Sequence, residues 1–415
     1  MKPLKTPELL LPAGSLEVLK VAVDYGADAV YIGGDVFSLR AKAKNFTRDE
    51  MAAGIAYAHS HGVKVHVTAN ILAHEYDLDA AREYFKELNE LKPDALIISD
   101  PGMFMLAKEL CPEAELHVST QANNTNSGSF NFWHAQGAKR VVCARELSLN
   151  EIAAIKKNIP EDMEVECFIH GAMCISYSGR CLLSAYFTGR DANRGACTHP
   201  CRWKYYITEE TRPGEYIPVE ENERGTYIFN SRDLCMIDHI PELMDAGIDS
   251  YKIEGRMKTA LYVAMVGRTY RKAIDWYMQG KDEYLSHLGW LKNEILKCTY
   301  RQYTTGFYFG KPREDAQIYD SNTYVTGYRY LGIAGAKDER GVHIVQKNKF
   351  CVGDEIEIMK PDGRDITVSV LGIKDIEGNK MDSCPHAAQD IWITLSQDPA
   401  EGDILRVRTE GYEGG

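Results

Sequence analysis

Short apolar runs alternate with helix-like stretches along about the first 300 residues. Eight runs are rich in β-branched residues and almost continuously hydrophobic, as strands buried on both faces of a parallel sheet are: residues 8–14, 29–34, 63–70, 95–100, 115–120, 140–146, 164–171 and 251–256. Stretches with helical periodicity separate them, and those at 15–26 and 47–62 end in a Gly suited to a helix C-cap.

Eight strand–helix units predict an α/β fold, a closed (β/α)8 TIM-like barrel. The alternative is an open, doubly wound sheet. The count of eight and the lack of a GxGxxG motif after the first strand favour the barrel.

The unit between the seventh and eighth strands is oversized, with about 80 residues. It starts with a Cys-rich segment and continues as a predicted hairpin over 203–219. SRDLC, which ends at Cys235, is expected to start a helix, where the partial positive charge would favour a thiolate. An insertion after a barrel strand lies on the face that holds active sites, so we expect the cysteines at the catalytic mouth.

The pattern of hydrophobic and polar residues changes after residue 300. An aromatic, Gly-rich stretch is followed by alternating strands and turn signals, which predict a small all-β barrel or sandwich. The predicted organisation is a barrel domain over 1–300 with the Cys-rich insertion at about 172–235, a connector over 301–325 and a C-terminal β-barrel domain over 326–415.

Composition narrows the function classes. The 415 residues carry a formal net charge of −12, so a general polyanion binder is excluded and any contact with nucleic acid must be local. No apolar run reaches the ~20 residues that a membrane helix needs, and the N-terminus lacks the pattern of a signal peptide. We therefore expect a cytoplasmic protein with no membrane partner.

Five of the 11 cysteines fall in one stretch, with the spacing Cys174-x6-Cys181-x15-Cys197-x3-Cys201-x33-Cys235. Accidental burial is disfavoured because Gly, Arg, Ser and Asn surround them. A zinc site usually contains a tight pair, and here only Cys197-x3-Cys201 qualifies. An iron–sulfur cluster held by four thiolates is the third interpretation. Composition alone does not separate zinc from iron–sulfur.

Residues 166–184, ECFIHGAMCISYSGRCLLS, resemble the signature of the U32 peptidase family along their whole length. The opening ELLLPAGS, YIGG and the later GRDANRGACTHPCRW are also similar to that family. Family members with this length and a C-terminal β-domain are implicated in hydroxylating the wobble uridine of tRNA to 5-hydroxyuridine, with prephenate as a required metabolite. The resemblance implies this activity here. The family's older name implies collagenase-like proteolysis.

Several relatives carry a [4Fe–4S] cluster, which the resemblance implies here as the cofactor, with zinc as the alternative. Cys174 and Cys181 lie on the family motif, and Cys197 and Cys235 match the spacing of the other two ligands. Cys201 is the nearest competitor for either of these two.

The residues favour a hydroxylase over a protease. The one His-Glu pair, at His74, lacks the second His of HExxH, and no GxSxG motif is present. A cysteine protease could pair His170 with Cys174 but would leave four clustered cysteines unexplained. The peptidase stays as the runner-up, and an iron–sulfur scaffold for a partner hydroxylase as a third possibility.

Polar residues at the ends of strands should line the mouth. The predicted catalytic residues are His170, whose charge changes near neutral pH, with Arg145, Glu146 and Glu254; the predicted substrate-binding residues are Arg40, Lys252, Arg256 and Trp203. Arginines there would hold a small dicarboxylate by paired hydrogen bonds. The alternative for each residue is a structural ion pair at the rim.

The expected macromolecular partner is tRNA. Residues 174–206 hold five Arg or Lys and one Asp, and residues 252–272 hold six Arg or Lys and one Glu. Both basic segments start at the predicted mouth, and Trp203 could stack an unpaired base. A homologous or paired U32 subunit is a further expected partner.

Overall fold

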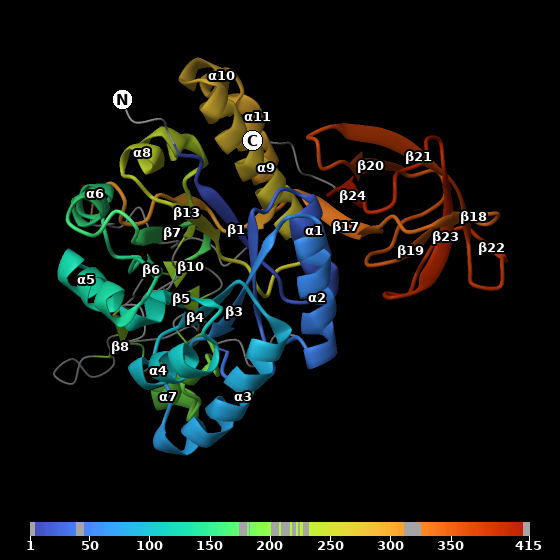
Figure 1. Cartoon of the computed structure of the whole chain (residues 1–415). Coiled ribbons are helices and arrows are strands. Elements are labelled where there is room, and N and C mark those ends of the chain that lie inside the picture. Colours follow the sequence, from blue (N-terminus) through green and yellow to red (C-terminus); the bar gives the residue numbers. More distant parts are fainter. Residues whose placement is uncertain are drawn as a thin grey trace.

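The structure is a computed structural model that describes residues 5–38, 45–173, 181, 183–200, 232–310 and 325–409, and four two-residue strands between 207 and 226 (Figure 1). Within these residues no helix is long and apolar enough to cross a membrane.

The eight apolar runs form a closed barrel of parallel strands, as predicted. The strands are β1 (Glu8–Pro12), β2 (Ala29–Gly33), β3 (Lys64–Ala69), β4 (Ala95–Ile98), β5 (Glu115–Val118), β6 (Arg140–Val142), β7 (Glu164–Ala172) and β13 (Ser250–Ile253). Neighbours pair in chain order, and β13 pairs with both β1 and β7, which closes the cylinder.

Helices surround the barrel and bury one face against it. They are α1 (Leu16–Asp24), α2 (Arg48–Ser60), α3 (Leu78–Leu91), α4 (Pro101–Leu110), α5 (Ser127–Gln136), α6 (Leu149–Lys157), α8 (Ile240–Asp245) and α9 (Ala260–Gln279), followed by α10 (Lys281–Ser286) and α11 (Leu288–Leu296). Thr47 and Ser148 start α2 and α6 with full capping boxes, which satisfy free amides of the first turn.

The insertion after β7 contains α7 (Leu183–Thr188) and a 3-10 turn, η3 (Ala192–Arg194). The predicted hairpin is confirmed in its described part, because β8 (Ile207–Thr208) pairs antiparallel with β9 (Tyr216–Ile217). A second short pair joins β10 (Glu221–Asn222) to β11 (Gly225–Thr226).

The expected helix start at SRDLC is wrong. Residues Asp233–Cys235 form strand β12, which pairs antiparallel with the end of β7 and parallel with β15 (Tyr303–Thr304). The buried ion pair between Arg301 Nη2 and Asp233 Oδ1, at 2.7 Å, holds β12 to the residues before β15. A short turn, η5 (Ile237–His239), then leads into α8.

The C-terminal residues form a separate antiparallel sheet with its own apolar core. Its strands are β17 (Tyr328–Ile333), β18 (Lys337–Asp338), β19 (Gly341–Val345), β20 (Glu355–Met359), β21 (Asp365–Lys374), β22 (Lys380–Met381), β23 (Asp390–Leu395) and β24 (Ile404–Arg408). A short pair, β14 (Thr299–Tyr300) with β16 (Val325–Thr326), precedes it.

The sheet docks beside the barrel through α1 and α9 (Figure 1). Tyr25, just after α1, donates from its hydroxyl to Met359 O at 2.7 Å and accepts from Ile404 N at 3.1 Å. On α9, the buried Arg268 donates to Asp365 Oδ1 at 2.9 Å and also pairs with Glu294 of α11. At the start of α1, Glu17 pairs with Lys347 of the sheet domain at 3.1 Å.

Candidate active site

The barrel strands run in one direction, so their carboxyl ends meet at one rim, where barrel enzymes hold their active sites. Most of the residues predicted for this rim are described. The exceptions lie outside the described residues: Arg40, Trp203, Cys174 and its neighbour in the cysteine cluster, Cys201.

Glu166 joins two cations inside the barrel. Its carboxylate accepts a hydrogen bond from Lys252 Nζ at 2.7 Å and another from Arg140 Nη1 at 3.1 Å. All three side chains are buried. Burial alone would raise the pKa of Glu166, but Lys252 and Arg140 outweigh it and lower that pKa to about 2. Glu166 therefore stays ionised, and much of the charge of Lys252 is neutralised within the protein.

Lys252, predicted to bind substrate, also lies over aromatic rings. Its Nζ is 4.5 Å from the centre of the Tyr31 ring and 5.6 Å from that of Phe168. A lysine enclosed by a carboxylate and two rings is well placed to support the site from within the barrel.

Arg256 ties the segment that follows β2 to strand β3. Its guanidinium donates to Thr68 Oγ1 and Asn45 Oδ1 at 3.0 Å each and to Ser38 Oγ at 2.5 Å. A Cβ at Gly33 would lie only 2.4 Å from its Nη1, so that glycine makes room for the arginine. The structural alternative therefore accounts for much of what Arg256 does here.

Arg145 lies at the rim with its guanidinium carbon 5.2 Å from the centre of the Phe168 ring. Its Nε is buried without a hydrogen-bond partner in the described part of the chain. The side-chain amide nitrogens of Asn123 and Asn124, in the loop after β5, are also buried without a hydrogen-bond partner in the described part of the chain. Glu146, next along the chain, is half-buried.

The loops that carry these donors are neighbours. Ala144 N donates to Asn124 O at 3.1 Å, and Thr120 Oγ1 donates to Cys143 O at 2.9 Å. A buried donor without an acceptor costs about 1–3 kcal/mol. Three such donors in adjacent rim loops favour a ligand that brings acceptor oxygens, as a carboxylate does.

His170 lies in a buried aromatic environment against α9. Its Nδ1 is 3.4 Å from Tyr270 Oη, and its ring contacts those of Tyr262 and Tyr303 at centroid distances of 6.1 and 5.4 Å. Burial lowers the pKa of His170 to about 3. The expectation that its charge changes near neutral pH is therefore wrong, and the position suits packing better than proton transfer.

Glu254 follows β13 at the rim, and its backbone is fixed on both sides. Its N–H donates to His170 O at 2.8 Å, and its carbonyl oxygen accepts from Tyr262 Oη at 3.1 Å. At Gly171, with φ of +111°, a Cβ would lie 2.3 Å from Glu254 O. The glycine of the U32-like motif thus allows the two chain segments to touch.

Three of the four predicted cluster ligands are described, and none of the three is in a disulfide. Cys181 and Cys197 are half-buried in the insertion. Cys235 ends β12, where its Sγ is 3.8 Å from Tyr270 Oη and burial raises the pKa of its thiol to about 12. The strand that replaces the expected helix start removes the predicted stabilisation of a thiolate at Cys235.

The described residues contain no group of three or more His, Cys, Asp or Glu side chains that could hold a metal ion. Cys174 and Cys201 lie outside the described residues, so this absence does not bear on a site that includes either of them.

Sequence reasoning missed Asn123 and Asn124 as rim donors and the role of Arg140. Asn123 has φ of +55°, a conformation that Asn tolerates, and the NN pair after a strand was the available signal. The charge of Arg140 at the start of a buried strand was a signal for a barrel-core ion pair.

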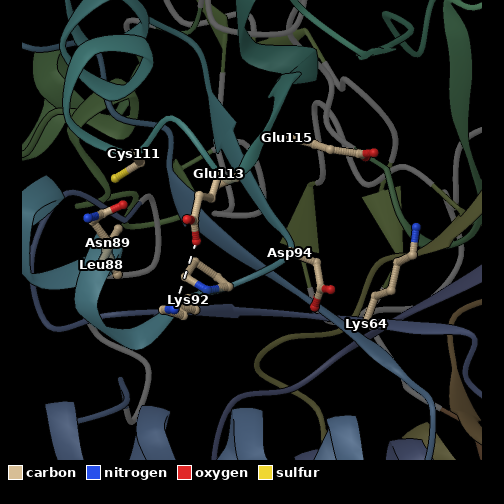
Figure 2. A pocket seen from close by; sticks show the side chains of 10 residues that line it. Lys64, Leu88, Asn89, Lys92, Asp94, Cys111, Glu113 and Glu115 are labelled. Atoms are coloured by element: carbon tan, nitrogen blue, oxygen red, sulfur yellow. Dashed lines mark ion pairs between the residues drawn. The ribbon is translucent and has the colours of Figure 1, made fainter.

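A pocket of about 330 Å³ lies at the opposite end of the barrel (Figure 2). Lys64 and Glu115 start β3 and β5, and Asp94 directly precedes β4, so the pocket opens at the amino ends of the strands. Lys92 and Glu113, drawn as a pair in Figure 2, are exposed and 4.0 Å apart. This end of a barrel contributes to stability more than to chemistry, so we do not place the active site there.

Two family models match the chain. One described as "Peptidase family U32" matches residues 14–318, and one described as "Peptidase family U32 C-terminal domain" matches residues 326–406. Together they cover the barrel from the residues after β1 onward, its insertion, and the antiparallel sheet as far as β24.

Three curated proteins are similar over most of their length. The "tRNA hydroxylation protein P1" of Bacillus subtilis is 40% identical and covers 97% of this chain and 95% of its own length. The "tRNA hydroxylation protein P2" of that organism is 35% identical over 74% of this chain and 98% of its own length. An "uncharacterized protease" of Methanocaldococcus jannaschii is 47% identical over 88% of this chain and 93% of its own length.

Proposed function

This chain belongs to peptidase family U32, and from that membership we propose that it is an enzyme of tRNA hydroxylation. One observation carries the proposal: the similarity to a tRNA hydroxylation protein extends over 97% of this chain, the antiparallel sheet included. A tRNA substrate also implies that the protein works in the cytoplasm.

The finer proposal is the conversion of a wobble uridine to 5-hydroxyuridine with prephenate as a required metabolite. Arg145, with Asn123 and Asn124, is our candidate for holding a carboxylate of that metabolite, because these residues offer buried donors that lack acceptors. The target base has to leave its stack to reach the rim, as bases do in other enzymes that act on them.

The proposed cofactor is a [4Fe–4S] cluster held by Cys174, Cys181, Cys197 and Cys235. The support for this proposal is chemical: four thiolates are the usual ligands of such a cluster, and none of the three described cysteines is in a disulfide. Iron and sulfide analysis after anaerobic purification tests this proposal. We expect about four irons per chain; stoichiometric zinc would favour the zinc alternative.

Nucleoside analysis of tRNA tests the function. A deletion strain carrying the wild-type gene should contain 5-hydroxyuridine, and the same strain with Arg145→Gln should contain much less at equal protein level. The exposed Arg364 of the C-terminal sheet gives a matched control, Arg364→Gln, which should restore the nucleoside fully. Equal nucleoside levels with and without the wild-type gene would overturn the proposal.

A peptidase is the second candidate, favoured by the family description and by the relative named as a protease. The predicted pair of His170 with Cys174 gains no support, because His170 is buried and neutral. Peptide cleavage by purified protein that is lost in Cys174→Ala would favour this candidate.

A scaffold role is the third candidate. In this case a second U32 subunit or another hydroxylase would perform the chemistry. Bacillus subtilis has two related tRNA hydroxylation proteins, which makes a paired subunit a reasonable partner. Activity that requires co-purified partner protein, with none from this chain alone, would favour the scaffold.

A further inference from the structure

Four exposed apolar side chains lie on loops that leave the carboxyl ends of barrel strands. Val36 follows β2, Tyr76 follows β3, Phe187 lies in the insertion after β7 and Met257 follows β13, and all four are exposed. Tyr76 is 73% exposed, more than any other large apolar side chain that the structure describes. The ring of Tyr76 contacts other planar groups in the described part of the chain.

Tyr76 belongs to a stack of planar groups. Its ring lies 5.4 Å from the ring of His74, with an angle of 28° between the planes. The guanidinium carbon of Arg194, from η3 of the insertion, lies 5.2 Å from the centre of the Tyr76 ring. Two elements far apart in sequence thus supply one aromatic and cationic stack.

Hydrogen bonds hold this stack in place. Both terminal nitrogens of Arg194 donate to the carboxylate of Asp77, at 2.8 and 3.0 Å, and Asp77 also accepts from His74 N at 2.7 Å. Leu72 N donates to Asn193 O at 3.1 Å and ties the two loops together. The stack is therefore ordered before any partner arrives, which lowers the entropy cost of binding.

We propose that His74, Tyr76 and Arg194 form a stacking platform for an unpaired base of the RNA substrate. This inference rests on the proposed function and names the surface that receives a nucleotide near the target base. Flat aromatic and guanidinium groups are the surfaces on which proteins stack single-stranded bases.

Local charge indicates contact with a base more than with phosphate. Asp77 neutralises Arg194, and Glu75 adds a carboxylate between His74 and Tyr76. A phosphate would meet no net positive charge here, whereas every base has a face that can stack. The contribution of Tyr76 to RNA affinity should therefore depend little on salt.

The test measures binding of an anticodon stem–loop RNA that carries 2-aminopurine in its loop. We expect Tyr76→Ala to weaken binding roughly 5- to 150-fold, since a stacked base contributes about 1–3 kcal/mol. Tyr76→Trp should retain affinity because it keeps a flat ring. Ile376→Ala, which changes an exposed apolar residue in the turn between β21 and β22, is the matched control and should bind like the wild type.

The salt dependence and the base signal complete the test. Tyr76→Ala should leave the slope of log Kd against log salt unchanged and should raise the fluorescence of the loop base in the complex, because that base is no longer stacked. Tyr76→Ala binding within about twofold of the wild type would overturn the platform, as would a wild type that binds no RNA.

The binding assay needs no modification reaction, so the platform and the proposed function fail in different ways. RNA that binds through Tyr76 but is never hydroxylated in cells overturns only the hydroxylation proposal. Hydroxylation that persists in Tyr76→Ala with unchanged RNA affinity overturns only the platform, and would leave the exposed rim to a protein partner.

Discussion

Lys252 Nζ and Glu166 Oε1 lie 2.7 Å apart inside the barrel, on the neighbouring strands β13 and β7. We predict that Lys252→Met destabilises the protein by about 3 kcal/mol, because a buried carboxylate loses one of its two cations. Urea unfolding measures the change. Lys5→Met is the control: Lys5 makes exposed ion pairs at 3.4 and 3.5 Å, and its loss should cost less than about 1 kcal/mol.

The same carboxylate predicts how stability depends on pH. The folded pKa of Glu166, about 2, is below its ordinary value of 4.5. Ionised Glu166 therefore stabilises the folded state above about pH 4.5, and this stabilisation is lost as the pH falls toward 2. The loss amounts to roughly 3 kcal/mol. Glu166→Gln should show a flatter decline of unfolding free energy over this range, and an unchanged decline would contradict the assignment.

We predict that the protein binds a carboxylate selectively through Arg145. Titration calorimetry with prephenate should show binding to the wild type and at least ~10-fold weaker binding to Arg145→Gln, since a charged hydrogen bond contributes about 1.5–3 kcal/mol. Arg145→Lys should also bind weakly because lysine lacks the planar, two-pronged donor geometry. Full affinity in Arg145→Lys would mean that charge alone matters at this position.

We predict that a methyl group added at Gly171 disrupts a close backbone contact. Gly171→Ala adds a Cβ 2.3 Å from Glu254 O at φ of +111°, so we expect a loss of more than about 2 kcal/mol. Gly189, at φ of +67°, has no atom near its added Cβ, and Gly189→Ala should cost only about 1 kcal/mol. Thermal unfolding of the two variants separates contact from conformation, and equal losses would show that the contact is unimportant.

The barrel could be predicted from sequence because each strand is buried on both faces and reads locally as an apolar run. The side of the sheet to which the His170 side chain turns could not be predicted from the sequence. Lys252 pairs with Phe168 and the next residue, Ile253, pairs with His170, so the register shifts by one residue between them. This bulge turns His170 toward α9 and away from the barrel interior, and the shift depends on the partner strand.

The site could be predicted only in part for the same reason. Arg145 and Lys252 follow from strand ends, which the sequence reveals. Cys235 was misplaced because strand β12 exists through pairing with β7 and with Tyr303, about 70 residues further along the chain. The residues around SRDLC do not indicate these pairing partners. The stack of Tyr76 on Arg194 likewise joins loops that no local pattern connects.

The most direct test of the account is mass spectrometry of the anticodon fragment of tRNA from cells with and without this gene. The account predicts that the fragment from cells with the gene carries the mass of one added oxygen at the wobble uridine, and that the fragment from deletion cells lacks it. Fragments of equal mass from the two strains would contradict it.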